Sequence, residues 1–307
     1  MSGDSPFFVV GCARSGTTLL RTMLDGHPRL AVPDESHFVI GLAPRWWRPG
    51  ATPTLDDILA HPKVRAWDVD RVMLRTRAEA VSPRGYAALV DAVFSAYADE
   101  HGKARWGDKT PGYVSYVPQL ARMFPDARFV HLVRDGREVA ASLAEWDWGA
   151  RTAVSGAWWW AHKVRVGRRD GARLGPERYL ELRLEDLTAA PEATLRRLCA
   201  FLGEGFAPEM LAYPDRVAAS GRPVRRQERH LVQPPTAGLR DWRSGLAVRD
   251  QQAVEEVCRP MLTACGYDTP APRPAARAYA VALRARDLSI TGVRDVRARL
   301  RPATREF

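Results

Sequence analysis

A glycine-bounded segment near the N-terminus has the residue types of an anion-binding loop. Residues 11–18, GCARSGTT, follow the apolar run Phe7–Val10, which predicts a buried strand, and they lead into a helix expected to begin near Thr17. Backbone N–H groups at such a helix start converge on an anion. The spacing fits the template G-x-x-x-x-G-K-[ST], except that Thr17 occupies the lysine position. Arg14 supplies a cation instead, and its guanidinium can bind two oxygens of one anionic group.

Two further polar groups are expected at the carboxyl ends of strands. Arg134 follows the apolar run Phe129–Val133, and Glu35 lies just beyond a short strand expected at Leu30–Val32. Ligands of open parallel sheets bind at this edge. A carboxylate there is suited to accept a proton as a general base. His37 is the alternative base, although a single histidine in a loop is more often a surface residue.

Composition limits the classes of partner. The chain has 307 residues, 46% of them hydrophobic, and a net charge of +10, with arginine outnumbering lysine. A positive balance suits an anionic ligand, although an Arg-rich and Ala-rich composition is also typical of a GC-rich bacterial genome. The sequence has no recognised nucleic-acid motif or dense Lys/Arg tract, so a nucleic-acid partner is disfavoured.

The cysteines and the apolar runs argue against a zinc protein, a disulfide-rich protein and a membrane protein. Cys12, Cys199, Cys258 and Cys265 form no C-x-x-C pair, so neither a zinc site nor a disulfide framework is expected. The sequence shows no obvious acidic metal cluster. No apolar run is long enough to predict a transmembrane helix, and the first residues lack the basic and apolar regions of a signal peptide. We therefore expect a cytoplasmic protein without a metal.

Alternating strands and helices predict an α/β fold with a parallel sheet and helices on both faces. The expected strands are Phe7–Val10, Leu30–Val32, Phe129–Val133 and Tyr179–Arg183. The expected helices are Thr17–Asp25, Tyr86–Tyr97, Gly136–Glu145, Ala153–Val166, Glu192–Leu202 and Asp250–Cys265. Residues 1–268 form the predicted domain. The remaining residues, 269–307, read as a Pro-containing linker and a basic helical tail that is dispensable for the chemistry.

Two motifs, in this order and spacing, resemble those of the sulfotransferases that use 3′-phosphoadenosine 5′-phosphosulfate (PAPS). Residues 14–20, RSGTTLL, are similar to the family's 5′-phosphosulfate loop. Residues 129–137, FVHLVRDGR, together with Ser142, are similar to its 3′-phosphate motif. The longer run through Glu35 is most similar to the tyrosylprotein sulfotransferase branch and its bacterial relatives. The resemblance extends over residues 7–267 and implies a P-loop-type parallel sheet.

The resemblance implies a role for each candidate residue. The residues expected to bind the 5′-phosphosulfate are Arg14, Ser15, Gly16, Thr17 and Thr18. Arg134 and Ser142 are expected to bind the 3′-phosphate. Glu35 matches the catalytic glutamate of the tyrosylprotein branch, and Lys109 resembles a lysine that the family places at the bridging oxygen of the donor. The implied catalytic group is therefore Glu35, Lys109 and Arg14.

Two positions depart from the family pattern. Leu184 stands where the family often has a tyrosine that contacts adenine, and Gln233 aligns with a late lysine that binds the 3′-phosphate. One of residues 158–160, three consecutive tryptophans, could take over the adenine contact, although they are more typical of a core. Arg240 or Arg243 could replace the missing lysine.

The sequence therefore predicts a PAPS-dependent sulfotransferase that acts on a hydroxyl of a small molecule, a sugar or a lipid. A protein tyrosine is the alternative acceptor, a P-loop kinase the alternative enzyme, and a nucleotide-binding interaction protein the alternative without catalysis. Thr17 argues against the kinase, whereas Glu35 and Lys109 argue against simple binding. The acceptor pocket is expected in residues 36–60 and 213–240. The oligomeric state is left open, a homodimer included.

Overall fold

The computed structural model of the chain describes residues 5–43, 53–80, 85–146, 150–219, 231–233 and 241–300, with side chains as far as residue 287. The chain divides into two compact units. Unit 1 comprises Met1–Arg134 and Val166–Leu239, and unit 2 comprises Asp135–Arg165 and Arg240–Phe307. Segments 44–52, 220–230 and 234–240 lie outside the described residues, so the acceptor pocket expected in residues 36–60 and 213–240 stays a prediction.

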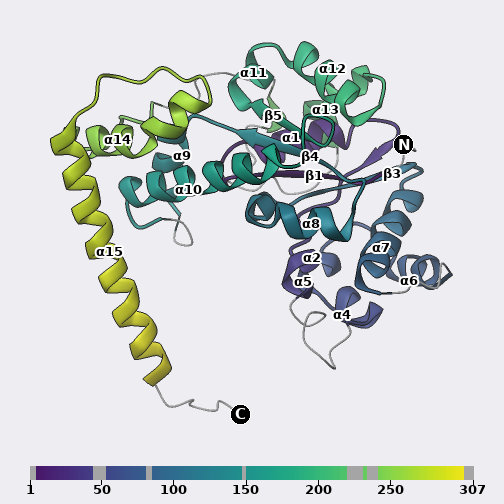
Figure 1. Cartoon of the computed structure of the whole chain (residues 1–307). Helices are drawn as coiled ribbons and strands as arrows, with labels where there is room; N and C mark the ends of the chain where they lie inside the picture. The colour runs from purple at the N-terminus through teal and green to yellow at the C-terminus, as the bar shows by residue number, and fades with distance from the viewer. Residues whose placement is uncertain are drawn as a thin grey trace. The chain divides into compact units, whose positions relative to one another are not determined.

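Unit 1 is built on a sheet of five parallel strands in the order β2-β3-β1-β4-β5 (Figure 1). The strands are β1 (Phe7–Gly11), β2 (Leu30–Ala31), β3 (Arg105–Lys109), β4 (Arg128–Val133) and β5 (Tyr179–Arg183). β1 lies at the centre, because Phe8 is paired with Asp108 of β3 on one side and with Phe129 of β4 on the other. The carboxyl ends of all five strands therefore lie along one edge of the sheet.

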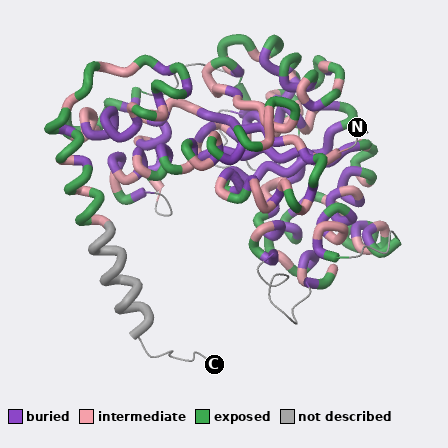
Figure 2. The backbone as a smooth tube through the Cα atoms, viewed as in Figure 1, coloured by how far each residue is buried: buried purple, intermediate pink, exposed green. Residues whose placement is uncertain are grey.

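Helices cover both faces of this sheet. Phe8 and Val10 of β1 pack in a cluster with α7 (Tyr86–Glu100). Phe7 and Val9 pack in a second cluster with α1 (Thr17–Leu24) and α12 (Pro191–Leu202). Because successive side chains of a strand point to opposite faces, β1 is buried on both faces, and Figure 2 shows the buried residues following the strands. The predicted fold class is confirmed, including a helix at the C-terminal end.

The remaining helices connect and cover these elements. In unit 1 they are α2 (Phe38–Gly41), α4 (Leu55–Leu59), α5 (Pro62–Arg65), α6 (Arg71–Ala80), η1 (Pro111–Ser115), α8 (Val117–Met123), α11 (Leu184–Ala189), η2 (Pro208–Met210) and α13 (Tyr213–Ala219). Unit 2 holds α9 (Gly136–Leu143), the first part of α10 (Ala153–Ala172), α14 (Val248–Ala264) and α15 (Pro274–Leu300).

β3 is the strand that the sequence analysis missed. Its residues, RWGDK, include one large apolar side chain, yet all five are buried. The Arg105 guanidinium donates to the carbonyl oxygens of Ser5 and Leu202, at 2.5 and 2.6 Å, and Lys109 forms an ion pair with Glu35. Buried charges are tolerated when they are paired. Hydrophobic periodicity cannot identify such a strand, because the partners of its charged residues are remote in sequence.

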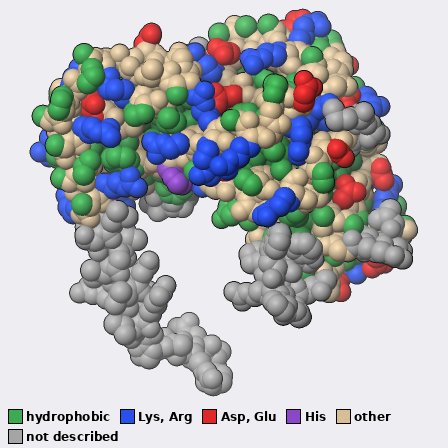
Figure 3. Space-filling view, viewed as in Figure 1, with side chains coloured by type: hydrophobic (Ala, Val, Ile, Leu, Met, Phe, Trp, Pro, Cys, Tyr) green, Lys and Arg blue, Asp and Glu red, His purple; other side chains and the backbone are tan. Residues whose placement is uncertain are grey.

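The surface arginines carry much of the positive charge. Lys and Arg side chains are prominent on the face drawn in Figure 3. Several pair with a nearby carboxylate, as Arg75 does with Glu79 and Arg196 with Glu192. Exposed pairs of this kind contribute little to stability. The net charge therefore identifies no partner by itself.

In unit 2 the chain that follows α14 stays in contact with this helix. The Arg273 N–H donates to Glu256 Oε1 at 2.7 Å, and the Arg273 guanidinium lies 2.5 Å from Glu255 Oε2. Ala276 and Ala280 of α15 are buried. The domain boundary at residue 268 stays a prediction, and these contacts are the ones that a truncation would remove.

A chain ending at Tyr267 is expected to fold and to retain the sheet, because the five strands of the described residues lie in unit 1. It should melt at a lower temperature than the full chain, because Glu255 and Glu256 lose Arg273 while they stay largely buried. Calorimetry compares it with a chain ending at Asp287, which keeps these contacts and should melt like the full chain. A chain ending at Tyr267 that does not fold would contradict the boundary.

Candidate active site

Three predicted site segments lie at the carboxyl edge of the sheet in unit 1. The loop 12–16 follows β1, Lys109 ends β3, and Arg134 follows β4. The chain leaves β1 toward β2 on one side of the sheet and leaves β4 toward β5 on the other. The connections therefore diverge between β1 and β4, which is where ligands bind in open parallel sheets.

The loop between β1 and α1 is tightly wound. Arg14 and Gly16 have positive φ angles of 72° and 85°, a conformation that glycine adopts freely and arginine only at a cost. The Ser15 N–H donates to the Cys12 carbonyl oxygen at 3.2 Å. A Cβ atom at position 16 would lie 2.6 Å from Leu184 Cδ1. Conformation and space therefore both require glycine here, and Leu184, which stands where the family often has a tyrosine, packs against this glycine.

The loop and the first turn of α1 present hydrogen-bond donors. The first N–H groups of a helix have no partner within it, and the helix dipole favours an anion there. The Ser15 side chain is buried, and its Oγ has no hydrogen-bond partner among the described residues. A buried hydroxyl without a partner is rare in folded proteins. The loop therefore has the donors that an anionic group requires, and binding of the 5′-phosphosulfate by residues 14–18 stays a prediction.

Arg134 contacts this loop directly. Its Nη1 donates to the Arg14 carbonyl oxygen at 3.2 Å, so the guanidinium lies beside the loop. Ser142, its predicted partner, is buried on α9 in unit 2. Joint binding of one phosphate by Arg134 and Ser142 stays a prediction.

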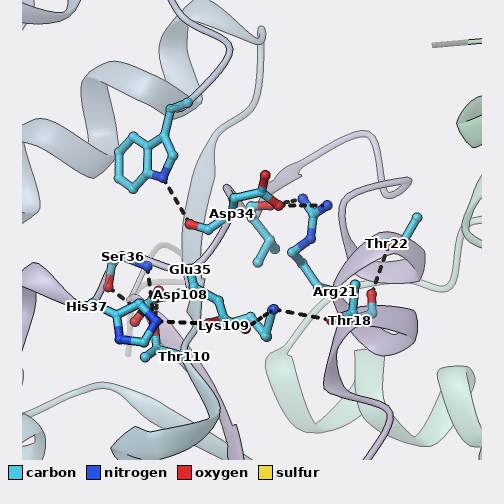
Figure 4. Close-up of polar contacts among 12 residues, drawn as sticks. Thr18, Arg21, Thr22, Asp34, Glu35, Ser36, His37, Asp108, Lys109 and Thr110 are labelled. Carbon is cyan, nitrogen blue, oxygen red and sulfur yellow. Dashed lines mark hydrogen bonds and ion pairs between the residues drawn. The ribbon is translucent and has the colours of Figure 1, made fainter. Parts of the chain in front are cut away.

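Lys109 and Glu35 form the central ion pair of the site (Figure 4). Lys109 Nζ lies 2.7 Å from Glu35 Oε1 and 3.4 Å from Thr18 Oγ1. The lysine side chain is 3% exposed. This burial lowers the pKa of Lys109, although the Glu35 carboxylate acts in the opposite direction. The pair joins the end of β3 and the segment after β2 to the start of α1.

The carboxylate of Glu35 has a partner on each oxygen. Oε2 lies 2.9 Å from His37 Nε2, while Oε1 faces Lys109. Burial alone would raise the pKa of Glu35, but the hydrogen bond with His37 and the charge of Lys109 outweigh it and hold the pKa at about 2. Glu35 is therefore ionised at neutral pH, and a carboxylate with so low a pKa is a weak base.

Buried hydrogen bonds hold the segment that carries Glu35. Trp67 Nε1 donates to the Asp34 carbonyl oxygen at 2.9 Å on one side. On the other side the Tyr86 hydroxyl donates to the Phe38 carbonyl oxygen at 2.7 Å. Glu35 is thus held between two anchored backbone positions rather than in a loose loop.

Ser36 links the same segment to the end of β3. Its N–H donates to Thr110 Oγ1 at 3.2 Å, and its hydroxyl lies 3.2 Å from the Tyr113 hydroxyl. The Thr110 hydroxyl donates to Asp108 Oδ1 at 3.1 Å. Burial raises the pKa of Asp108 to about 7, although its hydrogen bonds with Thr110 and Ser36 oppose the rise. The sequence analysis did not identify this network, and its only local signal is that Ser36 and Asp108 adjoin Glu35 and Lys109.

No helix among the described residues is both long and apolar enough to cross a membrane. No group of three or more His, Cys, Asp or Glu side chains among them could hold a metal ion.

The family model that matches this chain and two of its relatives are described as sulfotransferases. Residues 6–208 match the family model described as "Sulfotransferase family". The chain is 24% identical over 279 residues to protein-tyrosine sulfotransferase 2 of Gallus gallus, covering 85% of this chain and 69% of the relative. It is 25% identical over 281 residues to protein-tyrosine sulfotransferase A of Caenorhabditis elegans, covering 88% of this chain and 69% of the relative.

Solved structures share the fold. The sulfotransferase domain of the Synechococcus PCC 7002 olefin synthase aligns with a TM-score of 0.54 at 24% identity, covering 88% of this chain and 98% of that domain. The sulfotransferase domain from the curacin biosynthetic pathway aligns with a TM-score of 0.55 at 22% identity, covering 87% and 99%.

Arg14→Ala and Arg134→Ala are each expected to weaken binding of adenosine 3′,5′-bisphosphate by about 2–3 kcal/mol, the loss of a charge-assisted hydrogen bond in a partly buried site. Titration calorimetry with adenosine 5′-monophosphate separates the two, because Arg134→Ala should cost much less when the 3′-phosphate is absent. Arg196→Ala, a surface change paired with Glu192, is the control and should bind like wild type. Equal losses with both ligands would contradict the 3′-phosphate role of Arg134.

Asp108→Asn is expected to alter how stability depends on pH. Since folding raises the pKa of Asp108 from its ordinary 3.8 to about 7, the folded protein binds this proton more tightly, and stability falls as the pH rises between these values. Asparagine stays neutral, so the variant should gain about 2–3 kcal/mol on wild type between pH 5 and pH 8. Urea unfolding measures this, and a difference that does not change with pH would contradict the raised pKa.

Proposed function

The chain belongs to the sulfotransferase family, and from this premise we propose that it transfers a sulfuryl group from PAPS to a hydroxyl of a small molecule, a sugar or a lipid. One observation carries the proposal. Lys109, buried at the end of β3, contacts both Thr18 of the anion-binding loop and Glu35. One buried side chain therefore links the loop suited to bind a donor to the carboxylate suited to activate an acceptor.

The loop would bind the donor through its 5′-phosphosulfate. The N–H groups at the start of α1 and the Ser15 hydroxyl donate to the anionic oxygens. Arg14 binds two oxygens of the same group and stabilises the charge that develops on the leaving phosphate. Arg134, beside the loop, binds the 3′-phosphate. A sulfuryl group carries less charge than a γ-phosphoryl group, so these donors can neutralise it without a metal ion.

Lys109 can pair with Glu35 or contact the bridging oxygen of the donor, but it cannot do both at once. While it is paired with Glu35, the carboxylate is too weak a base to accept a proton from a hydroxyl. When Lys109 turns toward the bridging oxygen of the donor, Glu35 loses the nearest charge that lowers its pKa and becomes more basic. Glu35 then accepts the proton as the acceptor oxygen attacks sulfur in line. Binding of the donor therefore makes Glu35 a stronger base.

A protein tyrosine is the second candidate acceptor. The relatives described above are named protein-tyrosine sulfotransferases, and a phenol with a pKa near 10 is easier to deprotonate than an alcohol. We favour a small molecule, a sugar or a lipid on the bacterial character of the composition.

Incubation with ³⁵S-labelled PAPS and an extract of the producing cells tests the proposal. Label in a low-molecular-weight or lipid fraction is expected, whereas label in protein bands would favour tyrosine. Retention on immobilised adenosine 3′,5′-bisphosphate and indifference to Mg-ATP distinguish the protein from a P-loop kinase. PAPS that stays intact in the presence of the extract would contradict the transferase.

Glu35→Gln is expected to lower kcat by about 10²–10⁴-fold, because glutamine keeps the shape of the side chain and removes its basicity. The affinity for adenosine 3′,5′-bisphosphate should be nearly unchanged. The matched control is Asp34→Asn, an adjacent carboxylate that pairs with Arg21 at 3.1 Å and should leave kcat near wild type. Near-normal turnover of Glu35→Gln would remove Glu35 from the mechanism.

A further inference from the structure

The two oxygens of Glu35 face environments of opposite character. Oε1 is bound by the Lys109 ammonium, whose side chain is 3% exposed. Oε2 is bound by the His37 imidazole, whose side chain is 46% exposed. His37 therefore connects the carboxylate to solvent on the side away from the buried lysine. The role proposed for Glu35 as the base leaves this contact unexplained.

The backbone holds the imidazole at this position. His37 has a φ angle of 53°, in the left-handed region that a residue with a side chain rarely adopts. Its neighbours are both anchored, Ser36 by Thr110 and Phe38 by Tyr86. Hydrogen bonds of the residues before and after His37 therefore hold the backbone that places Nε2 against Glu35. Side chains of a functional site need such support from their surroundings.

The charges around His37 come from three elements. Glu35, on its own segment, contacts the imidazole through Oε2, and Lys109, at the end of β3, lies on the other oxygen of that carboxylate. His61, which precedes α5, also lies within electrostatic reach. Burial lowers the pKa of His61, and the charges of His37 and Lys63 lower it further. Geometrically, His37 Nε2 contacts Glu35 Oε2 on one side, and the imidazole is exposed on the other.

We propose that His37 is a second proton carrier of the transfer reaction, which takes the proton from Glu35 and releases it to water. This rests on the proposed function. The acceptor O–H bond breaks, its oxygen forms the new O–S bond, and the S–O bond to the leaving phosphate breaks with its electron pair. The proton passes to Glu35 and then to Nε2 of the neutral imidazole that carries its hydrogen on Nδ1. This is the other tautomer from the one whose Nε2–H donates to the ionised carboxylate, and the two tautomers exchange through water at the exposed ring. Glu35 is thereby returned to its ionised form.

Two variants at position 37 separate a carrier from a positioning residue. The rate measured is the multiple-turnover loss of ³⁵S from labelled PAPS with phenol present, a reading that includes transfer to water, because every turnover after the first needs Glu35 to be ionised again. His37→Ala and His37→Gln should each be slower by about 10²-fold. Imidazole in the buffer should restore His37→Ala, because the position is half exposed. Glutamine can donate to Glu35 without carrying a proton, so a glutamine variant at the wild-type rate, or an alanine variant that imidazole does not restore, would overturn the proposal.

The control is His101→Gln, at an exposed histidine that follows α7 and contacts the Tyr97 carbonyl oxygen at 2.9 Å. It should react at the wild-type rate and show no response to imidazole. Binding of adenosine 3′,5′-bisphosphate should be unchanged in both His37 variants. If Glu35→Gln releases ³⁵S slowly and the His37 variants release it at the wild-type rate, the relay is wrong. The proposed sulfotransferase activity would still stand. Wild-type protein that never releases label from PAPS would instead contradict the proposed function itself.

Discussion

Parallel pairing of β1 with β3 and β4 is the constraint on which the site depends. Because these strands run in the same direction, the loop after β1, Lys109 and Arg134 lie at one edge of the sheet although they are far apart in the sequence. Had β3 run the other way, Lys109 would lie at the opposite edge and Glu35 would lack its ion-pair partner. The candidate site therefore depends first on the direction of the strands, because that direction brings its side chains to one edge of the sheet.

Local patterns are enough to predict the parts of the site that follow apolar strands. The loop at residues 11–18 is marked by glycine spacing, and Arg134 and Glu35 by their positions just beyond apolar runs. The fold class follows from the same alternation of strands and helices. β3 is different, because its interior position is stabilised by partners such as Leu202 and Glu35 that no local pattern connects to it. Lys109 was identified by its motif, and the strand that carries it was not.

Contacts between side chains of separate segments are what sequence reasoning could not supply. The sequence offers His37 and Glu35 as alternative bases, whereas in the structure the two side chains are hydrogen-bonded to each other. The bonds from Ser36 to Thr110 and Tyr113 depend on the distance between the segment after β2 and the residues that follow β3. No periodicity or residue spacing in the sequence predicts the contact between Glu35 and His37 or the hydrogen bonds of Ser36. Such networks become visible only when the sheet order is known.

The polar character of β3 has a consequence for how this chain can adapt to heat. Asp108 and Lys109 are desolvated in the interior, where ionised groups oppose folding unless they are well paired. An apolar residue at position 109 would leave the Glu35 carboxylate, whose burial opposes its charge, without this counter-ion. Removing one partner of a buried ion pair is strongly destabilising. Greater tolerance of heat at this strand therefore requires both partners of the pair to change together.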